Sequence, residues 1–331
     1  MNPTRRRMLQ FALAVAGSRA AVAQERPLHI YMILFRGETE VERGFRNYFA
    51  VRGIAATLVV RDIAGELTRI PALIAEARAL AVDLIYTWGT SVTLAVVGAQ
   101  KERNPARHVT DIPVVFVMVT SPENAGLVTT RSGGQRNFTG AVHVVPLDRQ
   151  LVAMRAYRSF SRLAVVFNPA EPNSRQIVTE LREAARRERF ELIEGIVPLI
   201  AGQPDPAALP ALVATLARQK PSLLYLGPDS FLATHRKVFT EAAVAAGLPI
   251  FSATERPLRD GKALFGLVSP YENVGQLAAR KVEQILRRHI APQDIAIETL
   301  GRFSYIVNMP VASALEFYPP LKVLNYAEII R

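Results

Sequence analysis

The feature that most constrains the fold is a strand–helix alternation that runs through the chain twice. Short apolar runs rich in β-branched residues recur, and the apolar residues between them are spaced as on one face of a helix. The predicted strands begin near residues 28, 54, 82 and 112, and again near 162, 190, 222 and 248. Parallel strands whose connections are helices form a sheet that is covered on both faces. The fold class is therefore predicted to be α/β, with two doubly wound parallel-sheet lobes.

The same pattern divides the chain into segments. We expect residues 24–145 to form the first lobe, 146–268 the second, and 269–331 a C-terminal segment that crosses back between the lobes. Several crossings would make a hinge that bends without letting the lobes separate. In the first lobe, Thr39 and Glu42 predict a capping box at the start of a helix, and Gly53 predicts its end.

The first residues indicate an export signal. Arg5, Arg6 and Arg7 precede an apolar run from Met8 to Ala16, and small residues at Ala21 and Ala23 follow. This layout predicts a signal peptide over residues 1–23 and a periplasmic location. The paired arginines also fit a twin-arginine signal, and the alternative is an ordinary secretory signal. A lipoprotein anchor is not expected, because it requires a cysteine and the chain has none.

Composition excludes several function classes. Without cysteine there are no disulfides, thiolate metal sites or cysteine nucleophile. The five histidines do not have the spacing of metal ligands, so no metal is expected. No glycine-rich dinucleotide loop, phosphate loop or G-x-S-x-G elbow is found, so we predict no cofactor and no enzyme activity. The net charge is +11, but the basic residues are dispersed, which argues against a nucleic-acid partner.

Candidate binding residues come from the ends of the predicted strands, because open parallel sheets bind ligands beyond the carboxyl ends of their strands. Most of these residues are short, polar and suited to helix N-termini. The candidates are Phe35, Glu38, Trp88, Thr90, Ser91, Thr120, His143, Asn168, Asn173, Ser174, Asp229 and Thr254.

Four types of contact are expected from them. Thr90 and Ser91 follow Gly89 and would present helix amides to an anionic group. Asp229 would pair with an ammonium group, Trp88 would stack on a ring, and His143, near the lobe junction, would touch the ligand. There are plainer alternatives. Thr90, Ser91 and Asp229 would be helix caps or turn residues. Trp88 would pack between the lobes, and His143 would be structural.

Several stretches carry a resemblance to a known family. Ile112–Phe116 leads to Ser121-Pro122, Gly133-Gly134 leads to Asn137, Val165–Pro169 leads to Asn173-Ser174, and Phe303–Leu315 closes the likeness. The chain resembles ABC transporter substrate-binding proteins related to the tryptophan- and tyrosine-binding importer components, which have a type I periplasmic binding protein fold. The likeness departs at Gln135-Arg136, an apparent insertion, and at Trp88, where a smaller residue is expected.

The resemblance implies two lobes that close on a ligand, with Thr90, Ser91, Asn168, Asn173, Ser174 and Asp229 at the cleft. We expect a monomeric periplasmic binding protein that captures a small polar or zwitterionic molecule, such as an amino acid, and delivers it to an ABC permease. One alternative is a sensor-coupled binding protein that docks on a membrane receptor. Another is a two-lobed enzyme that uses Asp229, Glu38 or His143 as acid or base.

Overall fold

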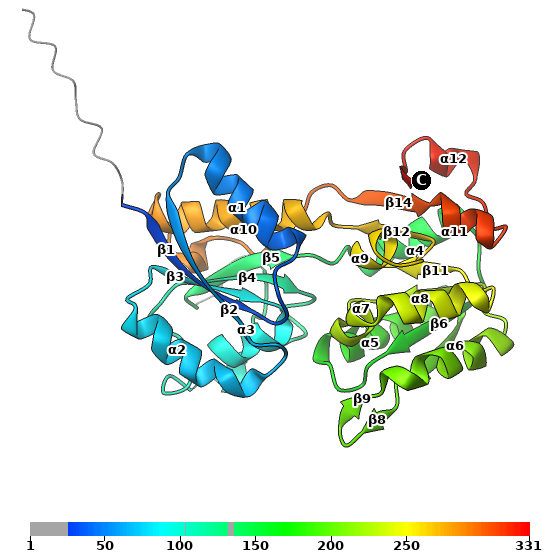
Figure 1. The fold of residues 1–331 in the computed structure, drawn as a ribbon, viewed down its shortest axis with the longest axis horizontal. Helices are drawn as coiled ribbons and strands as arrows, with labels where there is room; N and C mark the ends of the chain where they lie inside the picture. The colour runs from blue at the N-terminus through cyan, green and yellow to red at the C-terminus, as the bar shows by residue number, and fades with distance from the viewer. Residues whose placement is uncertain (1–25, 103, 132–135) are drawn as a thin grey trace, which may run out of the picture.

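The computed structural model describes residues 26–102, 104–131 and 136–331, which form two α/β lobes joined by several chain crossings (Figure 1). The predicted signal segment 1–23 lies outside the described residues. In the part of the chain that is described, no helix is both long enough and apolar enough to span a membrane.

Lobe 1 is built on a six-stranded parallel sheet with the order β13-β5-β4-β3-β1-β2. Helices α1 and α10 cover one face, and α2 and α3 cover the other. The strands are β1 (Leu28–Leu34), β2 (Ala56–Asp62), β3 (Leu84–Trp88), β4 (Val114–Val119), β5 (Phe138–Val142) and β13 (Glu298–Thr299). The helices are α1 (Glu40–Arg52), α2 (Ile70–Ala79), α3 (Thr90–Val97) and α10 (Tyr271–Leu286).

Alternation along β1 shows why this sheet is buried on both sides. Ile30 and Met32 pack toward α1 and α10, whereas Tyr31 and Ile33 pack toward α2 and α3, and all four are fully buried. A strand with two apolar faces needs helices above and below it. The predicted capping box at the start of α1 is confirmed, and so is its end at Gly53 in the left-handed conformation.

Lobe 2 contains a seven-stranded sheet with the order β15-β14-β12-β11-β10-β6-β7, in which β14 runs antiparallel to β12. The strands are β6 (Arg162–Phe167), β7 (Glu191–Ile196), β10 (Leu223–Leu226), β11 (Ile250–Ser252), β12 (Phe265–Val268), β14 (Ser304–Asn308) and β15 (Glu328–Ile330). Helices α4 (Leu147–Tyr157), α5 (Pro172–Glu188) and α11 (Met309–Ala314) cover one face. Helices α6 (Leu209–Arg218), α8 (Arg236–Ala245) and α9 (Arg256–Arg259) cover the other.

Three shorter features complete lobe 2. Helix α7 (Ser230–Thr234) precedes α8, a two-stranded hairpin pairs β8 (Leu199–Ile200) with β9 (Gln203–Pro204), and α12 (Leu321–Leu324) precedes the last strand. The sequence predicted one helix over 231–246, but the structure breaks it at His235 into α7 and α8.

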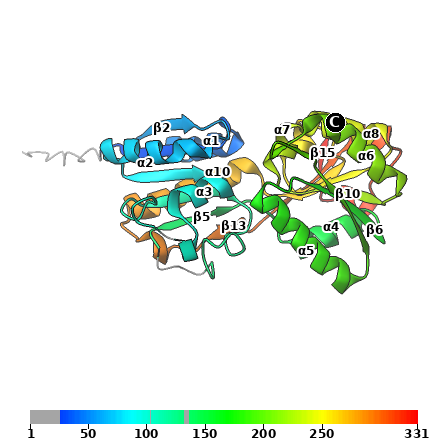
Figure 2. The same cartoon turned by 90° about the horizontal axis from the view of Figure 1, so that it is seen from below.

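The described chain passes between the lobes three times, after β5, after β12 and after β13. Helix α10 packs in lobe 1. In the sequence it lies between β12, which belongs to lobe 2, and β13, which belongs to lobe 1. Seen from below, α3 of lobe 1 and α5 of lobe 2 approach each other across the junction (Figure 2). Because three connections hold the lobes together, they can rotate relative to each other but cannot drift apart.

Candidate functional site

A cavity lies between the lobes at the carboxyl ends of β1, β3 and β4 and beside α7 of lobe 2. This is the place where parallel sheets bind ligands. Nine of the twelve residues predicted from the sequence line this cavity: Phe35, Trp88, Thr90, Ser91, Thr120, His143, Asn173, Asp229 and Thr254. The other lining residues are Arg36, Gly89, Met118, Pro228, Ser230, Ala233 and Tyr271.

The remaining three predicted residues lie elsewhere. Glu38 is largely exposed and forms an ion pair with Arg46 on the surface of lobe 1. Asn168 and Ser174 are buried behind the cavity wall, where the Asn168 amide and the Ser174 hydroxyl donate to Oδ2 of Asp229 at 2.8 and 2.6 Å. These two residues therefore position Asp229 and do not line the cavity.

The N-terminus of α3 opens onto the cavity. Gly89 precedes the helix with φ 88° and ψ 161°, a conformation that is open essentially only to glycine. No described side chain caps this helix, and Thr90 Oγ1 instead accepts from the Thr120 amide at 3.4 Å. Thr90 and Ser91 lie in the first turn of α3 and are not its caps, since Gly89 is the N-cap residue. The free amides and the helix dipole can hold an anionic group.

Arg36 joins the lobes across the cavity and was missed as a candidate. It follows β1, and its Nη1 donates to the Ser230 carbonyl and to Thr234 Oγ1 in lobe 2, the latter at 2.7 Å. Its Cζ lies 5.6 Å from the ring centroid of Trp88, which is a cation–π distance. Burial lowers the pKa of Arg36, but guanidinium remains protonated in proteins. Its position directly after β1 was the signal that could have identified it.

His143 and Tyr271 line the cavity from two chain crossings. Their rings meet edge to face, with centroids 6.5 Å apart. Burial lowers the pKa of His143 to about 4 and raises that of Tyr271 to about 12, so both groups are neutral at pH 7. Met118 reaches the cavity from a bulge in β4, where its φ is 57°. A strained backbone that redirects one side chain is common beside binding sites.

Asp229 has a structural role beside the one predicted for it. Its Oδ1 accepts from the Leu232 amide at 2.8 Å and so caps α7, while Oδ2 accepts from the Asn168 amide and the Ser174 hydroxyl. Three of about four lone-pair positions are therefore in use. Burial, and then the nearby charge of Glu171, raises the pKa of Asp229 to about 6.

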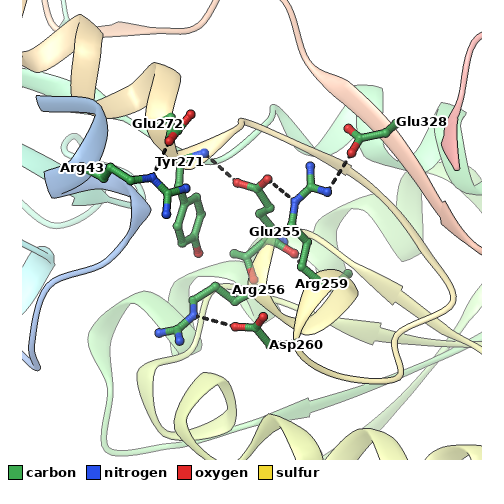
Figure 3. A network of polar contacts seen from close by, with 10 residues as sticks. Arg43, Glu255, Arg256, Arg259, Asp260, Tyr271, Glu272 and Glu328 are labelled. Atoms are coloured by element: carbon green, nitrogen blue, oxygen red, sulfur yellow. Dashed lines mark hydrogen bonds and ion pairs between the residues drawn. The ribbon is translucent and has the colours of Figure 1, made fainter. Parts of the chain in front are cut away.

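A polar network fixes the second crossing next to the cavity (Figure 3). Glu255 of lobe 2 accepts from the Tyr271 amide at 2.7 Å and from Arg259 Nε at 2.6 Å, and lies between them (Figure 3). Arg259 in turn reaches Glu328 of β15 at 2.7 Å. Glu255 thus caps α10 from the opposite lobe and holds Tyr271 at the cavity wall.

Three buried side-chain nitrogens in this cavity have no hydrogen-bond partner among the described residues: Arg36 Nε, Trp88 Nε1 and His143 Nδ1. Unpaired buried polar groups are rare and call for a partner outside the chain. In residues 26–102, 104–131 and 136–331, no group of three His, Asp or Glu side chains could hold a metal ion. Two lobes, three crossings and this cavity define a two-lobed ligand-binding protein.

Comparison with known proteins identifies the family. The family model described as ABC transporter substrate binding protein matches residues 70–330, and the chain belongs to this family. It is 25% identical over 235 residues to a "Tyrosine-binding protein" of Clostridioides difficile, a match covering 71% of this chain and 63% of that protein. The chain thus matches less than two thirds of that relative's length.

Solved structures share the fold. A conserved domain protein from Vibrio cholerae has a TM-score of 0.79 at 18% identity, and a Streptococcus pneumoniae ABC domain in complex with L-Trp has 0.78 at 17%. Each match covers 92% of this chain and all of the solved one. A leucine-binding protein from Thermotoga maritima has a TM-score of 0.57 at 15% identity, and the match covers 79% of this chain and 83% of that protein's chain. The type I periplasmic binding protein fold is therefore confirmed.

Proposed function

We propose that this protein is exported to the periplasm by the signal over residues 1–23. There it captures a small zwitterionic solute, such as an amino acid, and delivers it unchanged to an ABC permease. The observation that carries the proposal is the set of three unpaired nitrogens, Arg36 Nε, Trp88 Nε1 and His143 Nδ1, buried in one cavity. Leaving a buried polar group unpaired costs about 1–3 kcal/mol. A ligand that pairs with all three recovers that cost.

The cavity offers complementary ends to a zwitterion. The uncapped amides of α3 at Thr90 and Ser91, with Arg36 beside them, suit a carboxylate. Asp229, with one lone-pair position left, suits an ammonium group. The tyrosine-binding relative and the solved complex with L-Trp support an amino acid as the ligand class.

Contacts between the lobes support closure around the ligand. Arg36 reaches α7 of lobe 2, and Asn124 of lobe 1 donates to Glu180 of α5 at 3.0 Å. A solute that touches both lobes would favour this closed arrangement, because it binds the open one less well. Membership of the substrate-binding family supports a permease as the partner. We propose that the protein acts as a monomer.

A thermal-shift screen with amino acids, organic acids, nucleobases and sugars tests the proposal. A ligand present at about 100 times its Kd adds roughly 2.7 kcal/mol to the free energy of unfolding. We expect an amino acid to raise the melting temperature and Arg36→Met to abolish the rise. Arg46→Met, which removes only a surface ion pair with Glu38, is the matched control. A hit that is chemically consumed would instead indicate an enzyme.

A further inference from the structure

His143 occupies a distinctive position in the cavity. It follows β5 at the first crossing between the lobes, only 4% of its surface is exposed, and it lines the cavity. The ring of Tyr271 meets it edge to face, and both rings line the cavity. His143 therefore presents a buried imidazole with an aromatic ring beside it.

The hydrogen bonding of the imidazole decides what it offers to a ligand. The Val119 backbone raises the pKa of His143 against the larger effect of burial, as the acceptor of an imidazole N–H does, and Nδ1 has no partner among the described residues. We therefore assign the proton to Nε2. In a neutral imidazole the other nitrogen carries a lone pair and no proton. Nδ1 is therefore an acceptor. Desolvation lowers the pKa of His143 to about 4, which keeps the ring in this form at pH 7.

The cavity has a second acceptor of a different kind. Asp229 lies at the lobe 2 wall beside α7 and carries a carboxylate, the natural partner of an ammonium group. A buried neutral nitrogen beside the Tyr271 ring would not repay the desolvation of a full charge, but it suits an uncharged N–H or O–H. Asp229 would thus bind a charged ammonium group of the ligand, and His143 Nδ1 would bind an uncharged donor.

We propose that His143 Nδ1 accepts a hydrogen bond from the ligand's side chain, and so selects amino acids whose side chains carry a neutral N–H or O–H group. The proposal rests on the proposed function, since it assumes that an amino acid occupies the cavity. It predicts discrimination against an isostere without the donor, because that isostere leaves Nδ1 buried and unpaired. His143 is on this account a specificity-determining residue.

The test is calorimetric titration of the twenty common L-amino acids into the wild type and two variants. His143→Gln keeps an amide N–H in place of Nε2–H for the Val119 carbonyl but has no acceptor at the position of Nδ1. His143→Asn places an amide oxygen where Nδ1 was. His29→Gln, on β1 and not among the cavity-lining residues, is the matched control. The tightest ligand is compared with its donor-free isostere, such as phenylalanine for tyrosine, 1-methyltryptophan for tryptophan or methionine for glutamine.

We expect the tightest ligand to carry a side-chain N–H or O–H and to bind about tenfold more tightly than its isostere. His143→Gln should bring that ratio close to one, and His143→Asn should restore most of it, whereas a merely structural role would weaken both ligands equally. A tightest ligand without a donor, or an unchanged ratio in His143→Gln, would overturn this inference alone. Absence of binding by every amino acid would overturn the proposed function together with it.

Discussion

The close contact between helices α1 and α10 predicts a large effect from one added methyl group. Helices α1 and α10 pack with a glycine from each at the contact. A Cβ at Gly275 would lie 1.9 Å from the Val41 carbonyl oxygen and 2.7 Å from the Phe45 amide, and one at Gly44 would lie 2.0 Å from the Glu272 carbonyl oxygen. Ordinary contacts of this kind are about 3.5 Å, so Gly275→Ala must move α10 by about 1.5 Å.

The expected cost follows from two opposing contributions. Overpacking costs about 1–3 kcal/mol, and we take the upper end, about 3 kcal/mol, because the backbone atoms at this contact cannot turn away as a side chain could. The higher helix propensity of alanine returns about 1 kcal/mol. We therefore expect Gly275→Ala to lower the free energy of unfolding by about 2 kcal/mol. Because α10 begins at Tyr271 in the cavity wall, ligand affinity should fall as well.

Urea denaturation at equilibrium measures the change. Gly301→Ala is the matched control, because Gly301 lies in the third crossing with negative φ and nothing within 4 Å of a Cβ. That variant should be neutral or slightly stabilising, since alanine narrows the unfolded ensemble. If Gly275→Ala were as stable as the wild type, the close helix contact and the reasoning built on it would be wrong.

Three further outcomes are expected. Gly89→Ala should lower the melting temperature and weaken ligand binding, because its φ of 88° and ψ of 161° cost a side chain about 1–3 kcal/mol; unchanged melting would contradict this. Arg36→Lys keeps the charge but loses Nε–H and the planar fork, so calorimetry should show about tenfold weaker binding, and equal affinity would count against the role of Nε. Between pH 6.5 and about 4 the unfolded chain binds a proton at His143 that the folded protein does not, so the free energy of unfolding decreases as the pH is lowered through this range. His143→Gln should remove about 2–3 kcal/mol of that fall when denaturation at pH 7 and pH 4.5 is compared, and an equal fall would refute the assignment.

Elements with local signals could be predicted from the sequence. The strand over β1 and the helix α1 have clear apolar periodicity, a capping box at Thr39 and a terminal glycine at Gly53. Strand β5 was not predicted, because Gly140 interrupts its short apolar run, and the missing side chain there makes room for the ring of Phe116. Such a position depends on a neighbouring strand, which no local pattern reveals.

The site residues also divide into those with a local signal and those without one. Most residues just after strands were found, because the rule that ligands bind at strand ends needs only the strand positions. Arg36 also follows a strand and could have been included by that rule, but its contacts with α7, about two hundred residues away, have no local signal. Tyr271 was missed because it reaches the cavity through a chain crossing. The capping role of Asp229 was among the alternatives considered, but its bonds to Asn168 and Ser174 became visible only in three dimensions.

The most direct test of the central claim is calorimetric titration of the purified protein with each common L-amino acid, followed by mass spectrometry of the recovered ligand. The account predicts saturable binding of one amino acid per protein molecule, loss of that binding in Arg36→Met but not in Arg46→Met, and recovery of the ligand unchanged. Absence of binding by every amino acid, or recovery of a chemically altered ligand, would contradict it.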